Sequence, residues 1–187
     1  MPTRKSKPQE QPTQSAPRIF AANEHINQLL IEHLDPAVWT AKPPGNVRSI
    51  AAIFTHMHNV RTKWIRLTAP HLKIPAQLNR VHCTPQQARK ALAESAARCE
   101  EMLAEALQIE NGKSGEGNRA PRITQFVRDG WAKPWPAGPQ LPIQMLCYML
   151  AHEAHHRGQV TMLAHQLGFP LSTNITSNMW NWEKLWK

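Results

Sequence analysis

Two histidines interrupt the apolar stripe of a long helix that the sequence predicts over residues 141–167. The stripe recurs at helical spacing and runs Leu141, Met145, Met149, His152, His156, Val160, Leu163 and Leu167. His152 and His156 are four residues apart, so both rings project from one face of the helix. A buried imidazole without a partner is costly. A metal ion is the partner that would satisfy both rings together.

Three further segments carry helical periodicity, and no alternation typical of strands is visible. We expect long helices over residues 18–34, 47–67, 84–107 and 141–167, and a short last helix over residues 178–186. Asn46 is the expected cap of the second helix, and Thr84 with Gln87 forms a capping box at the third. Gly168 and Pro170 end the fourth. Four long amphipathic helices predict an all-α fold, a four-helix bundle.

The chain of 187 residues is long enough for one domain with a sizeable core. Residues 1–17 are rich in Pro, Gln, Lys and Ser, and we expect them to be a disordered basic tail before a single domain over 18–187. The net charge of +9 invites a nucleic-acid interpretation. No predicted helix has a dense Lys/Arg face, however, so we do not expect nucleic-acid binding. Residues 119–140 are rich in proline and mostly irregular, with 123–127 as a candidate short strand.

The cysteines and the N-terminal residues indicate in which cellular compartment the protein is expected. Cys83, Cys99 and Cys147 are odd in number and far apart, so they form neither a disulfide framework nor a CxxC metal site. The sequence has no apolar run long enough to span a membrane, and residues 1–17 lack the apolar centre of a secretory signal. We therefore expect a cytoplasmic protein without a membrane partner.

The predicted second helix supplies two more histidines, His56 and His58. At 100° per residue, His56 lies about 80° from the centre of that helix's apolar face and His58 about 120° away on the other flank. His56 is therefore favoured, by a small margin, as the inward group. One nitrogen from His56 and two from His152 and His156 would leave a coordination position open, as in catalytic rather than structural zinc sites.

These residues carry a family resemblance. The mid-helix His56 followed by the element His152-Glu153-Ala154-His155-His156-Arg157-Gly158-Gln159 resembles the DinB/YfiT-like superfamily of proposed metalloenzymes, over roughly residues 20–171. The resemblance implies an up-down-down-up four-helix bundle, often a homodimer. It also implies a divalent metal, commonly zinc or nickel, bound by His56, His152 and His156. Some members are S-transferases for low-molecular-weight thiols.

Several neighbours of the ligands have more than one interpretation. His58 and His155 are expected to support the ligands or to be exposed. Arg157 would anchor a substrate anion or form a salt bridge. Gln159 would orient a ligand histidine or fill a polar gap between helices. Glu153 and His156 have the Glu-x-x-His spacing of di-iron bundles, but the matching second pair is missing. Five tryptophans would line a pocket or a dimer contact, or simply pack: Trp131, Trp135, Trp180, Trp182 and Trp186.

The leading functional hypothesis is a metal-dependent enzyme that activates a thiol or water, either a thiol S-transferase or a hydrolase, acting on a small molecule. Cys147 points about 140° away from His152 on the predicted helix and is not a plausible nucleophile. One alternative is a non-catalytic dimeric protein whose basic tail contacts an acidic partner. Another is a module that senses or stores a metal. The catalytic residues, the metal and the substrate are not determined by the sequence.

Overall fold

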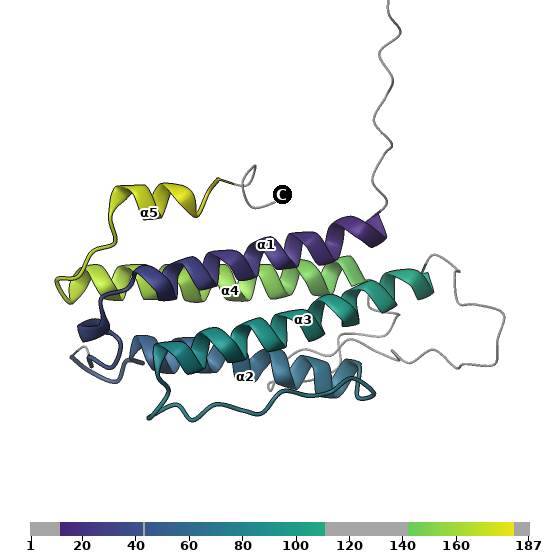
Figure 1. The fold of residues 1–187 in the computed structure, drawn as a ribbon, viewed down its shortest axis with the longest axis horizontal. Coiled ribbons are helices and arrows are strands. Elements are labelled where there is room, and N and C mark those ends of the chain that lie inside the picture. Colours follow the sequence, from purple (N-terminus) through teal and green to yellow (C-terminus); the bar gives the residue numbers. More distant parts are fainter. Residues whose placement is uncertain (1–11, 43, 111–141, 182–187) are drawn as a thin grey trace, which may run out of the picture.

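Four long helices form the expected bundle in the computed structural model, which describes residues 12–42, 44–110 and 142–181 (Figure 1). The long helices and a short fifth one are α1 (Pro12–His33), α2 (Ile50–Thr68), α3 (Pro85–Glu110), α4 (Pro142–Gln166) and α5 (Thr173–Asn178). A 3₁₀ turn, Pro36–Val38, follows α1. The all-α prediction is confirmed for the described residues.

The helices run in the up-down-down-up order that the resemblance implies (Figure 1). Helices α1 and α4 run in one direction, and α2 and α3 run in the other. Parallel neighbours cannot be joined by a short turn, so residues 69–84 travel back along α2 before α3 begins. Asn59 fastens this connection, since its side chain donates to Leu78 O (3.1 Å) and accepts from Leu78 N (2.9 Å).

The helix ends follow local capping chemistry. Thr84 N donates to Gln87 Oε1 (2.9 Å) and Gln87 N donates to Thr84 Oγ1 (3.2 Å), which confirms the predicted capping box. Gly168 follows α4 with a φ of +87°, which confirms it as the residue that ends the helix. The expected cap of α2 was wrong. Ser49, not Asn46, accepts from Ala52 N at 3.3 Å, and the helix begins at Ile50.

Two other boundaries need correction. Helix α1 already begins at Pro12, so residues 12–17 belong to the helix and not to the tail, and Ala16 is 1% exposed in the core. The described part of the chain has a short helix at 173–178, capped by Ser172, and it ends at Asn178, where the expected last helix was to begin; residues 182–186 of that expected helix are outside the described part. Residues 1–11, the candidate strand at 123–127 and residues 182–187 lie outside the described part of the chain.

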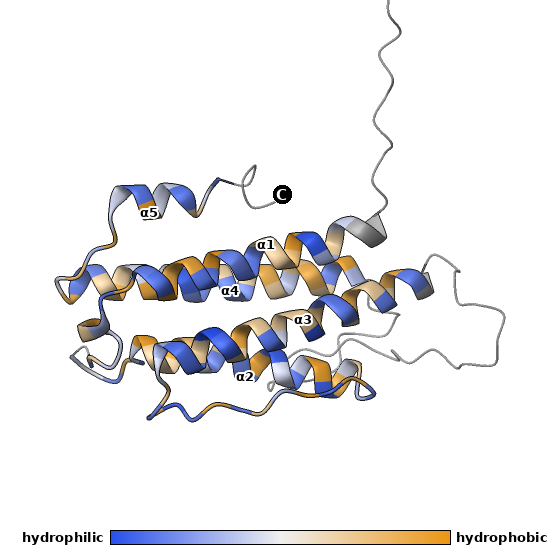
Figure 2. Ribbon diagram, in the orientation of Figure 1, coloured by the Kyte–Doolittle hydropathy of each residue, from blue (hydrophilic) through white to orange (hydrophobic). Residues whose placement is uncertain are grey.

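The core consists of two apolar clusters with a polar layer between them. One cluster includes Phe20, Trp64 and Met149, and the other includes Leu30, Phe54 and Val160. Figure 2 shows polar and apolar residues interspersed along each helix, as expected when a helix buries only one face. No helix among the described residues is both long and apolar enough to cross a membrane.

Candidate metal centre

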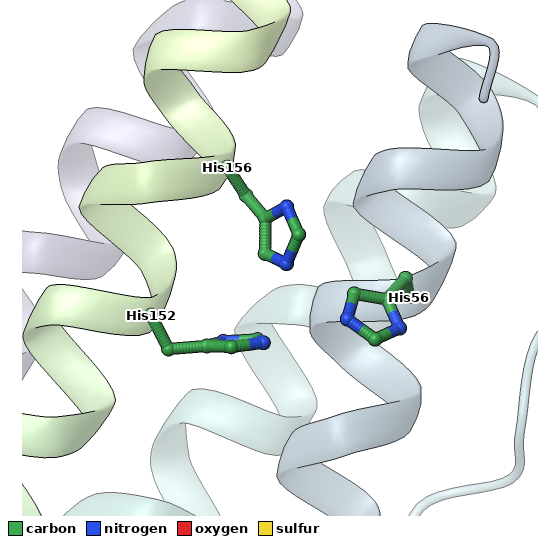
Figure 3. Close-up of side chains that lie close together, drawn as sticks. All are labelled: His56, His152 and His156. Carbon is green, nitrogen blue, oxygen red and sulfur yellow. The ribbon is translucent and has the colours of Figure 1, made fainter. Parts of the chain in front are cut away.

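The three predicted ligands meet between α2 and α4 (Figure 3). Their ligand nitrogens all lie within 4.8 Å of one another. The ring centroid of His56 is 5.4 Å from that of His152 and 4.8 Å from that of His156, and the two α4 rings are 4.6 Å apart. The HxxxH spacing places two rings one turn apart on α4, and the antiparallel α2 brings the third ring opposite them.

The donor set fits a divalent ion. Nitrogens that bind a tetrahedral zinc at about 2.0–2.1 Å lie about 3.3 Å from one another. Rings whose nitrogens are already within 4.8 Å reach that spacing through small side-chain rotations. Three imidazoles suit zinc, nickel and other first-row ions, and they leave at least one coordination position for a further ligand. This geometry brings together all three predicted residues.

The surroundings of His56 and His156 favour the neutral form that binds metals. Burial disfavours the charged ring and, with the nearby Arg48 and the other two histidines, lowers the pKa of His56 to about 3. Burial also lowers the pKa of His156, although its hydrogen bond with Gln159 acts in the opposite direction. A proton therefore competes weakly with a cation for these nitrogens at neutral pH.

Gln159 orients one ligand. Its Oε1 lies 2.7 Å from His156 Nδ1, so it accepts the proton of that nitrogen. The tautomer that donates through Nδ1 leaves the Nε2 lone pair available for a metal, and such a partner also fixes the ring orientation. Of the two roles expected for Gln159, this contact supports the orientation of a ligand histidine over the filling of a polar gap.

Aromatic side chains and a cavity flank the cluster on different sides. Trp64 packs edge-on against His152, with ring centroids 5.4 Å apart, and Tyr148 lies next to both rings. A cavity of about 340 Å³ adjoins Gln159 and is also lined by Arg48. None of the three histidines lines this cavity, and Arg48 places a cationic side chain in its wall.

A buried ionic network lies next to the histidines and was not predicted. It consists of Asn23, Glu24, Asn27, Arg61, Glu153 and Arg157, all buried, and is called the central network here. Arg61 donates from Nε and Nη2 to the two oxygens of Glu153, each at 2.6 Å. Its Nη1 contacts Glu24 (2.8 Å) and donates to Leu92 O (2.9 Å).

The central network satisfies charges that would otherwise be expensive to bury. Burial works against ionisation of Arg61, but Glu153 and Glu24 outweigh it and raise its pKa. Burial likewise acts to raise the pKa of Glu153, and Arg61 reverses this and lowers it. Asn23 and Asn27 donate to the same carboxylate at 2.6 and 2.8 Å. Both charges are therefore retained inside the bundle.

Other predicted residues take roles outside the metal cluster. His58 is fully buried, with its nitrogens 3.1 Å from Ser95 Oγ and 2.8 Å from Ala76 O, so neither expectation for it was right: it neither supports the ligands nor is exposed. His155 is exposed. Glu153 contributes to the central network rather than to a di-iron site. Cys147 is exposed, and Cys83 and Cys99 are buried in the apolar clusters.

The comparisons with known proteins agree with this architecture. A sequence model of the DinB family matches residues 10–184. A crystal structure of a protein from Exiguobacterium sibiricum 255-15, described as a candidate member of the DinB family, superposes with a TM-score of 0.53 at 16% sequence identity. The match covers 87% of this chain and 96% of that one. No curated protein matches the chain at a significant level. The match along nearly its whole length shows that the chain belongs to the DinB family.

Proposed function

We propose that the protein is a metal-dependent enzyme in which His56, His152 and His156 hold one divalent ion, zinc or nickel. The observation that carries the proposal is the convergence of three imidazoles from two helices, with their ligand nitrogens within 4.8 Å of one another. A divalent ion held there would lower the pKa of a bound thiol or water.

The surroundings favour transfer of a thiol over hydrolysis. A metal-dependent hydrolase typically uses a carboxylate as general base beside the metal. Glu153, which follows His152 directly, instead gives both oxygens to Arg61 and is fully buried, and its pKa is lowered by that guanidinium despite the opposing effect of burial. A thiol that ionises at the metal needs no such base. We therefore infer a thiol S-transferase acting on a low-molecular-weight substrate.

The nucleophile would come from the substrate. Cys83 and Cys99 are buried in the core, and Cys147 is exposed on the early part of α4. Arg48 faces the adjoining cavity and would attract a thiol that carries a carboxylate. The protein side chains would thus bind, orient and desolvate the reacting thiol.

Metal analysis followed by an activity screen tests the proposal. Protein purified without chelators, or reloaded with zinc or nickel, should hold about one ion per chain. His152→Ala and His156→Ala should each lose it, whereas the exposed neighbour His155→Ala should keep it. The loaded protein should then consume a low-molecular-weight thiol in the presence of an electrophile, and His152→Ala should not.

Three results would contradict the proposal. A chain that binds no ion after reloading, or loses it equally in His155→Ala, has no three-histidine site. A loaded chain that consumes no thiol but hydrolyses esters or amides would favour the hydrolase. A loaded chain with neither activity would favour a metal-binding protein without catalysis.

A further inference from the structure

A second cavity lies on the far side of α4 from the histidines. Its volume is about 490 Å³, within the range of small-molecule sites, and α1, α4 and α5 all contribute to its lining. At 100° per residue, the α4 residues Ala154, Gly158 and Thr161 lie roughly 180° from the pair His152 and His156. Figure 1 shows α5 standing off α1 and α4 on the side away from α2, which carries His56.

Gly158 leaves the wall of this cavity open. It lies in the middle of α4, where glycine destabilises a helix relative to alanine. A Cβ built at Gly158 would meet nothing within 4 Å, so packing inside the chain gives no reason for a glycine. The open backbone does allow close approach by a molecule that enters the cavity.

Arg157 gives the cavity a positive charge at its base. Its Nη1 donates to the neutral amide oxygens of Asn23 (2.7 Å) and Asn27 (3.1 Å). The carboxylate that pairs with it, Glu153, is 4.0 Å away and already accepts two hydrogen bonds from Arg61. Arg157 therefore lies near a carboxylate but does not form a hydrogen bond with it. Of the lining residues that the structure describes, Arg157 is the one with a formal charge.

Apolar side chains form the rest of the lining. Ile26 comes from α1, Leu150 from α4, and Met179 and Trp180 follow α5. Trp180 is 77% exposed and lies at the cavity without being packed into the core. A ligand that fits this arrangement has an apolar body for these walls and one anionic group for the guanidinium.

We propose that the cavity between α1, α4 and α5 binds a small apolar molecule with a single carboxylate or sulfonate, paired with Arg157. The site is separate from the metal centre, and its occupancy does not depend on a bound metal. The ligand class follows from the lining, which is mostly apolar and contains one cationic side chain. An anionic group on the ligand would complement the charge of that side chain.

A matched pair of fluorescent probes tests the charge requirement on the full-length protein. 8-Anilinonaphthalene-1-sulfonate carries the anion, and N-phenyl-1-naphthylamine is its counterpart without the sulfonate. The sulfonate probe should bind tighter by about tenfold or more, since a hydrogen bond to a charged group contributes roughly that much. Arg157→Gln should bring the two affinities close together.

A pair of leucine substitutions tests the location. Gly158→Leu fills part of the cavity and leaves Arg157 unsubstituted. It should weaken binding of the sulfonate probe by about tenfold or more, because the added side chain occupies the space that the probe needs. Ala93→Leu adds the same apolar group on an exposed position of α3 and should leave binding unchanged. Circular dichroism and thermal melting confirm that each variant is folded. If Arg157→Gln does not fold, the proposal is still tested by the ratio of the two probe affinities in the unaltered chain and by the comparison of Gly158→Leu with Ala93→Leu.

Three outcomes would overturn the proposal. If the neutral probe binds as tightly as the sulfonate, Arg157 does not pair with the anion. If Gly158→Leu binds the sulfonate probe as well as the unaltered chain does, the probe does not occupy this cavity. If the probe fails to bind and sedimentation shows a dimer that Gly158→Leu dissociates, this face contacts a second copy of the chain.

Discussion

The guanidinium of Arg61 on α2 binds the carboxylate of Glu153 on α4 through two hydrogen bonds of 2.6 Å. Glu153 directly follows His152, and Arg61 lies five residues after His56. The pair therefore joins the two helices that carry the histidines, close to the level at which the rings meet. Both side chains are fully buried, so water does not compete for this contact. The ion pair fixes the position of one part of the metal site relative to the other.

Glu153→Gln should lower the free energy of unfolding by about 3 kcal/mol, because removing one partner leaves a buried charge poorly compensated. The expected loss is at the lower end of the range for such pairs, since Glu24 still contacts Arg61 at 2.8 Å. Urea unfolding of the purified variant measures the change.

Glu101→Gln is the matched control. It breaks the pair between Arg98 and Glu101, which is equally short at 2.6 Å but lies on the surface of α3 with side chains 38% and 41% exposed. Surface pairs contribute about 0–1 kcal/mol. Equal losses in the two variants would show that the central network does not join α2 to α4.

Gln159→Leu should weaken metal binding by about 10–100-fold, the usual cost of removing the group that orients a ligand histidine. The side chain is exposed, so the fold should be unaffected. Competition with a chromophoric chelator measures the affinity. Gln144→Leu, an exposed position near the start of α4, serves as the control. An unchanged affinity in Gln159→Leu would mean that the 2.7 Å contact with His156 does not support the metal.

Local patterns were sufficient to predict the bundle and its ligands. The 3.6-residue period defined four helices, and the HxxxH spacing placed His152 and His156 on one face. The choice of His56 over His58 rested on a small angular difference and on the family resemblance. His58 was placed wrongly because residues 69–84 return along its side of α2 and bury it, and the path of a connection does not follow from helical periodicity.

The central network was missed although a signal for it existed. Arg61 lies between Met57 and Trp64 on the apolar side of α2, where an unpaired charge would be very costly. Asn23 and Asn27 break the apolar side of α1 at a spacing of four. Their shared partner, Glu153, is more than 120 positions away in the sequence. Periodicity identifies such polar residues as unusual, but it does not identify which of them pair across helices.

Gly158→Ala should raise the free energy of unfolding by about 0.5–1 kcal/mol, because alanine has the higher helix propensity. The added Cβ meets nothing within 4 Å, so no steric cost offsets the gain. For a chain of this size the melting temperature should rise by about 2–4 °C per kcal/mol. Differential scanning calorimetry measures the shift. A lower melting temperature would show that another molecule, such as a second copy of the chain, packs against this glycine.

The three cysteines should differ sharply in reactivity. Burial raises the pKa of Cys83 and Cys99, and Cys99 is 0% exposed, so neither thiol is accessible or ionised at neutral pH. Cys147 is exposed on α4. An aromatic disulfide reagent should therefore titrate about one thiol in the native chain and all three in denaturant, and Cys147→Ser should abolish the native reaction. Cys83→Ser is the control and should leave it intact. Fast native labelling of a second thiol would mean that the core around Cys83 or Cys99 opens readily, and it would contradict the protection that burial gives these two thiols.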